Sequence, residues 1–172
     1  MPATEVMPGA RVYVGLGSNL DDPPTQLARA FEALARIAHT RLLRHSRLYR
    51  SAPWGNTDQP AFVNAVAELA SALAPSDFLA ALLDIERVQG RRRDGERWGP
   101  RTLDLDLLLF GERQSTEPGL TLPHPRMAER AFVLVPLAEL DTDLRIPGAG
   151  VVRDLLRHVD AHDCVPLDDG VA

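Results

Sequence analysis

Residues 102–110 restrict the fold most, because aspartate alternates with leucine before the sequence becomes wholly apolar. Successive side chains of a β-strand point to opposite faces of the sheet. A strand here therefore places Asp104 and Asp106 on one face, and the leucines beside them on the other face, in a core. The apolar run that ends the stretch is typical of a buried strand. It disfavours the alternative, an acidic edge strand kept soluble by its charge.

Two carboxylates on one face repel each other unless a positive charge neutralises them. The neutralising group is usually a hard divalent cation, which for a phosphate substrate is Mg²⁺. Arg97 and Arg101 precede the aspartates and can hold phosphate oxygens that a metal leaves exposed. The segment thus predicts metal-assisted chemistry on a phosphate, with Asp104 and Asp106 as metal ligands.

Strand patterns and helix patterns alternate through the first two thirds of the chain. Strands are expected at residues 11–16, 43–51, 62–71 and 102–110, and helices at residues 25–38 and 76–88. This β-α-β-β-α-β order predicts an α+β fold of the ferredoxin-like type, in which a four-stranded antiparallel sheet carries two helices on one face. A C-terminal extension with short helices near residues 131–140 and 151–159 is expected to follow.

The 172 residues, 45% of them hydrophobic, fit one domain with a sizeable core. We expect this domain to span residues 10–162, with flexible termini at residues 1–9 and 163–172. The sequence has no apolar run of 18 residues and no signal-peptide pattern, and Cys164 has no second cysteine to pair with. These features predict a cytoplasmic protein without a membrane partner.

The net charge of −5 argues against a general affinity for nucleic acids. All 19 basic residues are arginine, so a bound phosphate must be held by guanidinium groups, backbone N–H groups or a metal. Six of these arginines fall between residues 87 and 101. This concentration of positive charge in an acidic chain predicts a local anion site.

Five segments together resemble one enzyme family. They are GLGSNL at 15–20, SRLYRS at 46–51, DQPAFVN at 58–64, RWGPRTLDLD at 97–106 and LPHPR at 122–126. In these segments the chain is similar to the 6-hydroxymethyl-7,8-dihydropterin pyrophosphokinases, and the likeness runs from Val12 to about Leu140. The fourth segment is the signature of that family.

The resemblance implies that ATP donates its β,γ-pyrophosphoryl group to the hydroxymethyl group of the pterin and leaves as AMP, in tetrahydrofolate biosynthesis. It implies two Mg²⁺ ions held by Asp104 and Asp106. Arg91 and Arg93 match loop arginines that act in catalysis by closing over the phosphates. It further implies a monomer whose partners are these two small substrates. No general base is evident from the sequence.

The resemblance also implies the residues that bind each substrate. Those expected at the pterin are Ser51, Pro53, Trp54, Phe62, Asn64, Trp98 and Phe132. Phe62 and Phe132 would stack on the ring and Asn64 would bind its amide edge; for both aromatic residues the alternative is a place in the core.

The positions expected at ATP are Glu86, Arg91, Arg93, Trp98, Arg101, Leu107, Thr121, His124 and Arg130. For Glu86 the alternative is a charge on the helix surface, and for His124 it is a structural role. Gly119 stands where some family members have arginine, so one nucleotide contact is expected to differ.

Two other functions remain open on the sequence alone. A ferredoxin-like sheet with aromatic residues and an arginine-rich loop can bind single-stranded RNA, although the acidic composition opposes this. A metal-dependent phosphohydrolase could use the same pair of aspartates. It would release phosphate from ATP in the absence of a pterin.

Overall fold

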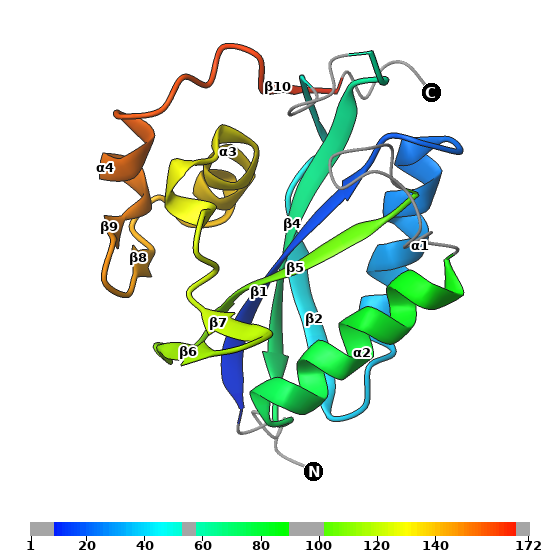
Figure 1. Ribbon diagram of the computed structural model, residues 1–172, viewed down its shortest axis with the longest axis vertical. Coiled ribbons are helices and arrows are strands. Elements are labelled where there is room, and N and C mark those ends of the chain that lie inside the picture. Colours follow the sequence, from blue (N-terminus) through cyan, green and yellow to red (C-terminus); the bar gives the residue numbers. More distant parts are fainter. Residues whose placement is uncertain (1–8, 53–57, 90–101, 168–172) are drawn as a thin grey trace, which may run out of the picture.

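The computed structural model describes residues 9–52, 58–89 and 102–167 of the chain (Figure 1). Its centre is a pair of long antiparallel strands, β1 (Ala10–Ser18) and β4 (Phe62–Ser71), joined in continuous register from Ala10 opposite Ser71 to Ser18 opposite Val63. Strand β5 (Asp104–Phe110) pairs with the other side of β1. The fold is therefore α+β with an antiparallel sheet, as the sequence predicts.

The outer part of the sheet differs from the prediction. Three short strands, β2 (Thr40–His45), β3 (Tyr49–Ser51) and β10 (Val165–Pro166), bring the described sheet to six strands instead of four. The strand expected at 43–51 is divided because Ser46 interrupts the ladder: its backbone N–H donates to the Val66 carbonyl, and its hydroxyl accepts from the Val66 N–H. As a result, β2 pairs with one end of β4 and β3 with the other.

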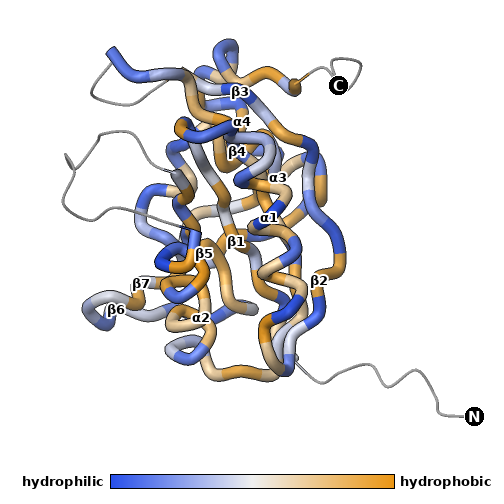
Figure 2. The backbone as a smooth tube through the Cα atoms, turned by 90° about the vertical axis from the view of Figure 1, so that its right-hand side faces the viewer, coloured by the Kyte–Doolittle hydropathy of each residue, from blue (hydrophilic) through white to orange (hydrophobic). Residues whose placement is uncertain are grey.

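Helices α1 (Pro23–Ala35) and α2 (Pro75–Val88) cover one face of the sheet (Figure 1). Both begin with proline, which fits the first turn because its missing N–H has no partner there anyway. Hydrophilic and hydrophobic residues alternate along α1 with the helical repeat (Figure 2). Its buried side chains, including Leu27 and Leu34, pack with residues of β1, β4 and β5 in the larger of two cores.

The C-terminal extension covers the opposite face of the sheet. Helix α3 (Ala131–Leu140) packs there with α4 (Val152–Leu156) and a small hairpin of β8 (Arg145–Ile146) and β9 (Gly150–Val151). Between β5 and this layer lie the hairpin β6 (Ser115–Glu117) and β7 (Leu120–Leu122) and the short 3-10 helix η1 (Met127–Glu129). The molecule thus has three layers, with the sheet in the middle.

An irregularity in β5 supplies side chains to both cores. The register with β1 shifts between Tyr13 and Val14, which lie opposite Leu109 and Leu107. Leu108 is the extra residue of this bulge, and it joins Leu109 in the core under α3, whereas Leu107 packs under α1 and α2. The apolar end of β5 is therefore buried on both faces.

The C-terminal segment expected to be flexible from residue 163 is placed in the structure as far as residue 167. Val165–Pro166 pair with β3, and the Leu167 N–H donates to the Leu48 carbonyl. Cys164 is buried, which raises the pKa of its thiol to about 11. None of the described helices is both long enough and apolar enough to cross a bilayer.

Glu68 of β4 is a buried charge on the α3 side of the sheet, only 1% exposed. Its carboxylate accepts a hydrogen bond from Arg44 Nε at 2.6 Å and forms an ion pair with Arg11. Burial would raise the pKa of Glu68, but the hydrogen bonds from Arg44 and Arg11 outweigh it and leave the pKa lowered. The two arginines therefore fix the carboxylate in its charged form.

Replacing this carboxylate, Glu68→Gln, should lower the free energy of unfolding by about 1–2 kcal/mol at pH 7, since both arginines are half-exposed and partly screened. Because folding lowers the pKa of Glu68, its contribution is complete above the unfolded pKa of about 4.3 and is lost as the pH falls through the lower, folded pKa. Urea unfolding of both proteins between pH 3 and pH 7 measures this; a difference that does not shrink in acid would contradict the assignment.

Candidate active site

Asp104 and Asp106 begin β5 and point to the α3 face of the sheet, while Leu103, Leu105 and Leu107 are buried in the opposite core. The predicted alternation is confirmed. Directly across from the aspartates on β1 lie Gly17 and Gly15, which pair with Asp104 and Asp106 respectively. Because glycine has no side chain, the sheet beside the two carboxylates is open.

The first of two pockets that both aspartates line lies over this open part of the sheet. It brings together five of the residues expected at the pterin or ATP with the two aspartates; the five are Ser51, Phe62, Asn64, Arg130 and Phe132. Phe62 comes from β4 and Phe132 from the first turn of α3, so the aromatic rings approach the pocket from different layers. The Ser51 hydroxyl donates to Asn64 Oδ1 at 2.5 Å, which orients the amide at the base of the pocket.

The second pocket lies on the other side of the aspartates, between α2, β5 and the β6–β7 hairpin. It brings together Asp104 and Asp106 with four residues expected at ATP, which are Glu86, Leu107, Thr121 and His124. Leucines of α2 complete its apolar side. Arg130, also expected at ATP, lines the first pocket instead. The two aspartates line both pockets and mark the place where they meet.

Glu86 is not a surface charge, as one reading of the sequence allowed. It is 2% exposed, and its Oε2 accepts a hydrogen bond from the Leu105 N–H at 2.8 Å. Leu105 stands between Asp104 and Asp106, so this bond joins the end of α2 to the backbone that carries both carboxylates. Glu86 therefore supports the strand that carries Asp104 and Asp106, as well as lining the second pocket.

His124 faces Asp106, with its Nε2 at 4.0 Å from the carboxylate Oδ1. The ring Nδ1 accepts a hydrogen bond from the Arg126 N–H, so in the neutral ring the proton is on Nε2 and points toward Asp106. Burial lowers the pKa of His124 and outweighs the opposite effect of Asp106; Arg130 and Arg126 lower it further. Burial likewise lowers the pKa of Arg130, against the attraction of Asp106.

The donor atoms fit magnesium. Mg²⁺ is usually held by one or two carboxylates together with substrate phosphates and water, and not by a complete protein cage. Asp104 and Asp106 offer two carboxylates at the junction of the pockets. The described residues contain no cluster of three or more histidine, cysteine, aspartate or glutamate side chains that would form a cage.

Several expected site residues lie outside the described residues, namely Pro53, Trp54, Arg91, Arg93, Arg97, Trp98 and Arg101. The sequence analysis did not name Gly15 and Gly17 as site residues, although both lie within β1 and line the first pocket. Glycine inside a strand pattern often marks a close approach of a ligand to the backbone, and that signal was present.

Gly119, which stands where some family members have arginine, lies in the turn of the β6–β7 hairpin at the edge of the second pocket. Gly119 has a φ of +80° and follows Pro118, an arrangement typical of a type II turn, which favours glycine at this position. The turn therefore accounts for this glycine without reference to the nucleotide.

Comparison with known proteins gives one consistent result. The family model for 7,8-dihydro-6-hydroxymethylpterin-pyrophosphokinase (HPPK) matches residues 13–142. A 2-amino-4-hydroxy-6-hydroxymethyldihydropteridine pyrophosphokinase of Pseudomonas aeruginosa is 56% identical over 146 residues, which cover 85% of this chain and 90% of that protein. The enzyme of the same name from Haemophilus influenzae is 42% identical over 156 residues, which cover 91% of this chain and 97% of that protein.

Solved structures show the same fold. A crystal structure of an HPPK-DHPS in complex with substrates matches 88% of this chain with a TM-score of 0.67 at 9% identity, and wild-type Plasmodium falciparum HPPK-DHPS with pteroate matches 87% with a TM-score of 0.67 at 12% identity. This chain spans less than half of those structures, 43% and 42% respectively. From the family model and the curated relatives, the chain belongs to the 7,8-dihydro-6-hydroxymethylpterin-pyrophosphokinase family.

Proposed function

We propose that this chain transfers the β,γ-pyrophosphoryl group of ATP to the hydroxymethyl group of 6-hydroxymethyl-7,8-dihydropterin and releases AMP. Family membership makes it a transferase of folate biosynthesis. The observation that carries the proposal is the meeting of two pockets at Asp104 and Asp106. One pocket has aromatic walls and a fixed amide, as a flat heterocycle requires, and the other has the residues expected at a nucleotide.

The pterin is assigned to the first pocket. Phe62 and Phe132 would stack on the heterocycle from β4 and α3. Asn64, oriented by Ser51, would bind the polar edge of the ring. Gly17 supports this assignment, because a Cβ atom there would lie 3.0 Å from Asn64 Nδ2 and would occupy the space the ring needs.

ATP is assigned to the second pocket, with its base toward the leucines of α2 and β7 and its phosphates toward the aspartates. His124 Nε2–H and the Arg130 guanidinium stand at the junction and can donate to phosphate oxygens. The resemblance adds Arg91, Arg93, Trp98 and Arg101 for the phosphates, and Pro53, Trp54 and Trp98 for the pterin. The donors beside the aspartates would balance the charge of the transferred group and hold it in line with the pterin hydroxyl.

We assign two Mg²⁺ ions to Asp104 and Asp106, on the resemblance and on the fit of their oxygen donors. When bound, magnesium neutralises phosphate charge and makes the phosphorus more electrophilic. On the family resemblance and the absence of a signal-peptide pattern, we also propose that the chain acts as a monomer in the cytoplasm. Residues 10–162 would form the catalytic domain.

A direct test incubates the protein with Mg-ATP and 6-hydroxymethyl-7,8-dihydropterin and separates the nucleotides by chromatography. AMP that forms only when the pterin is present supports the proposal. Phosphate release from ATP without the pterin would indicate a phosphohydrolase instead. A salt-dependent RNA gel shift without AMP formation would indicate an RNA-binding module.

The carboxylates can be removed with little change of shape by Asp104→Asn and Asp106→Asn. Each variant should form AMP at least about 100-fold more slowly, because the loss of a metal-ligand charge removes several kcal/mol of transition-state stabilisation. Both side chains are partly exposed, so the melting temperature should stay within a few degrees. Asp84→Asn on the exposed surface of α2 is the matched control. Near-normal AMP release from either site variant would refute the metal assignment.

Gly17→Ala tests the pterin pocket separately. The new Cβ atom would meet Asn64 Nδ2 at 3.0 Å and Phe62 Cδ1 at 4.0 Å, so the amide must move. We expect KM for the pterin to rise about tenfold, the effect of a modest overpacking, while the affinity for a non-hydrolysable ATP analogue stays the same. At Gly15 an added Cβ meets only ordinary contacts with Leu108 from 3.5 Å, so Gly15→Ala should have a smaller effect. Equal losses in the two variants would contradict this geometry.

A further inference from the structure

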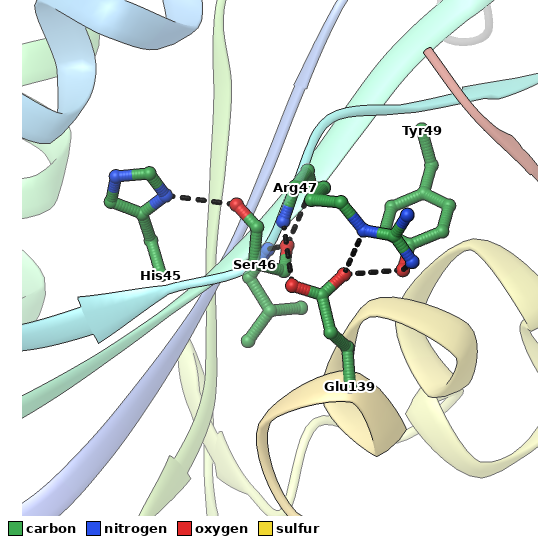
Figure 3. Close-up of polar contacts among 6 residues, drawn as sticks. His45, Ser46, Arg47, Tyr49 and Glu139 are labelled. Carbon is green, nitrogen blue, oxygen red and sulfur yellow. Dashed lines mark hydrogen bonds and ion pairs between the residues drawn. The ribbon is translucent and has the colours of Figure 1, made fainter. Parts of the chain in front are cut away.

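Glu139, near the end of α3, is held by the segment that runs from β2 to β3 (Figure 3). Its carboxylate accepts three hydrogen bonds: from the Tyr49 hydroxyl at 2.5 Å, from the Arg47 N–H at 3.0 Å and from Arg47 Nε at 3.1 Å. Tyr49 is buried, and Glu139 is about one quarter exposed. None of these three residues lines either of the two pockets assigned to substrates.

Both partners keep the protonation state that this contact needs. Burial raises the pKa of Tyr49 to about 12, and its hydrogen bond to Glu139 adds to the shift, so the phenol retains its proton at neutral pH. Burial would raise the pKa of Glu139, but the hydrogen bonds from Tyr49 and Arg47 lower it on balance. The contact is therefore a charge-assisted hydrogen bond, stronger than one between neutral groups.

The strand and the helix joined here also form the pterin pocket. Ser51 follows Tyr49 by two residues on β3, so both side chains point to the same face, and Ser51 lines the pocket. Phe132 precedes Glu139 by seven residues, about two turns, and therefore lies on the same side of α3, about 10 Å along its axis. The hydrogen bond between Tyr49 and Glu139, called the tether below, and the pocket thus lie at two points along one contact between β3 and α3.

The other contacts of α3 leave its exact position less restricted. Its buried side chains, Val133, Leu134 and Leu137, pack in an apolar core, and such contacts have little directional preference. The helix has only ten residues and contains Pro136, which cannot donate the backbone hydrogen bond to the Phe132 carbonyl. Directional contacts such as those of Glu139 must therefore contribute to the spacing between α3 and the sheet.

We propose that Tyr49 and Glu139 are positioning residues for the pterin: their hydrogen bond holds α3 at the distance from β3 at which the heterocycle fits between Phe62 and Phe132. This inference rests on the proposed function, because it concerns the pocket assigned to the pterin. It also predicts selectivity between substrates. No lining residue of the second pocket belongs to β3 or α3, and of the described residues assigned to ATP only Arg130 adjoins α3, so binding of ATP should depend on the tether much less than binding of the pterin does.

The test measures the affinity of Tyr49→Phe and Glu139→Ala for the pterin, at saturating Mg²⁺ and a non-hydrolysable ATP analogue. Tyr49→Phe removes one hydroxyl and keeps the buried ring. We expect the Kd for the pterin to rise roughly tenfold, the scale of one charge-assisted hydrogen bond, and the Kd for the analogue to change by less than about twofold. In steady-state assays KM for the pterin should rise more than kcat falls.

Three further variants separate positioning from loss of stability. Glu68→Gln removes the charge from a comparable buried contact on the same face of the sheet, away from both pockets, and should leave pterin affinity unchanged. Glu139→Gln keeps an oxygen that can accept from Tyr49 and should recover much of the affinity lost in Glu139→Ala. The double variant Tyr49→Phe/Glu139→Ala should bind the pterin no more weakly than Glu139→Ala, since both changes remove one contact.

The proposal is wrong if Tyr49→Phe and Glu139→Ala bind the pterin as the unmodified protein does, or if they lose pterin and analogue affinity equally. A loss of pterin affinity in Glu68→Gln as large as that in Tyr49→Phe would also overturn it, because the effect would then follow stability alone. If the unmodified protein itself fails to bind the pterin or to form AMP, the proposed function fails instead.

Discussion

The site depends on the alternation of charge and apolar bulk along β5. Because neighbouring residues of a strand point to opposite faces, one sequence segment fills the core under α1 and α2 with leucine and presents two carboxylates on the other face. Burial of the leucines holds the backbone of β5 in place, and this backbone in turn fixes the positions of the two carboxylates. Glu86 stabilises this arrangement, because its carboxylate accepts a hydrogen bond from the Leu105 N–H and so joins α2 to the residue between the two aspartates.

The neighbouring strand makes the carboxylates accessible. Gly15 and Gly17 lie directly across from them on β1, where any larger residue would stand beside the acidic groups. The layer formed by α3 then closes the space above the sheet and contributes Phe132. The pocket therefore arises from separate parts of the chain: an acidic strand, a strand with glycines, the strands that carry Ser51, Phe62 and Asn64, and a helix from the C-terminal extension.

The elements predictable from the sequence were those with a strong local pattern. The bounds of β4 agree with the expected strand at 62–71, and the α3 bounds agree with the expected helix at 131–140, because each is a largely apolar run of ten residues. The facing of Asp104 and Asp106 followed from the alternation of side chains along a strand. For Phe62, Asn64 and Phe132, the structure brings together residues that the family resemblance had named.

What the sequence did not reveal depends on contacts between distant residues. The division of the strand at 43–51 follows from the bonds of Ser46 to Val66, and the pairing of β10 follows from its distant contact with β3. The burial of Glu86 likewise depends on β5, nineteen residues away along the chain. None of these contacts leaves a periodic pattern in the sequence. Local patterns alone therefore predict one continuous strand at 43–51, a flexible tail at β10 and a surface charge at Glu86.

The outer strand β2 has an edge at which aggregation could begin, and charge on the same strand opposes it. Within the described residues β2 pairs only with β4, so its other edge has backbone groups to which a strand of a second molecule could add. Arg41 on β2 is exposed, and two copies of β2 placed edge to edge would each place this positive charge at the shared edge. Mutual repulsion at that edge should therefore oppose the growth of intermolecular sheets and keep the protein from aggregating at high concentration.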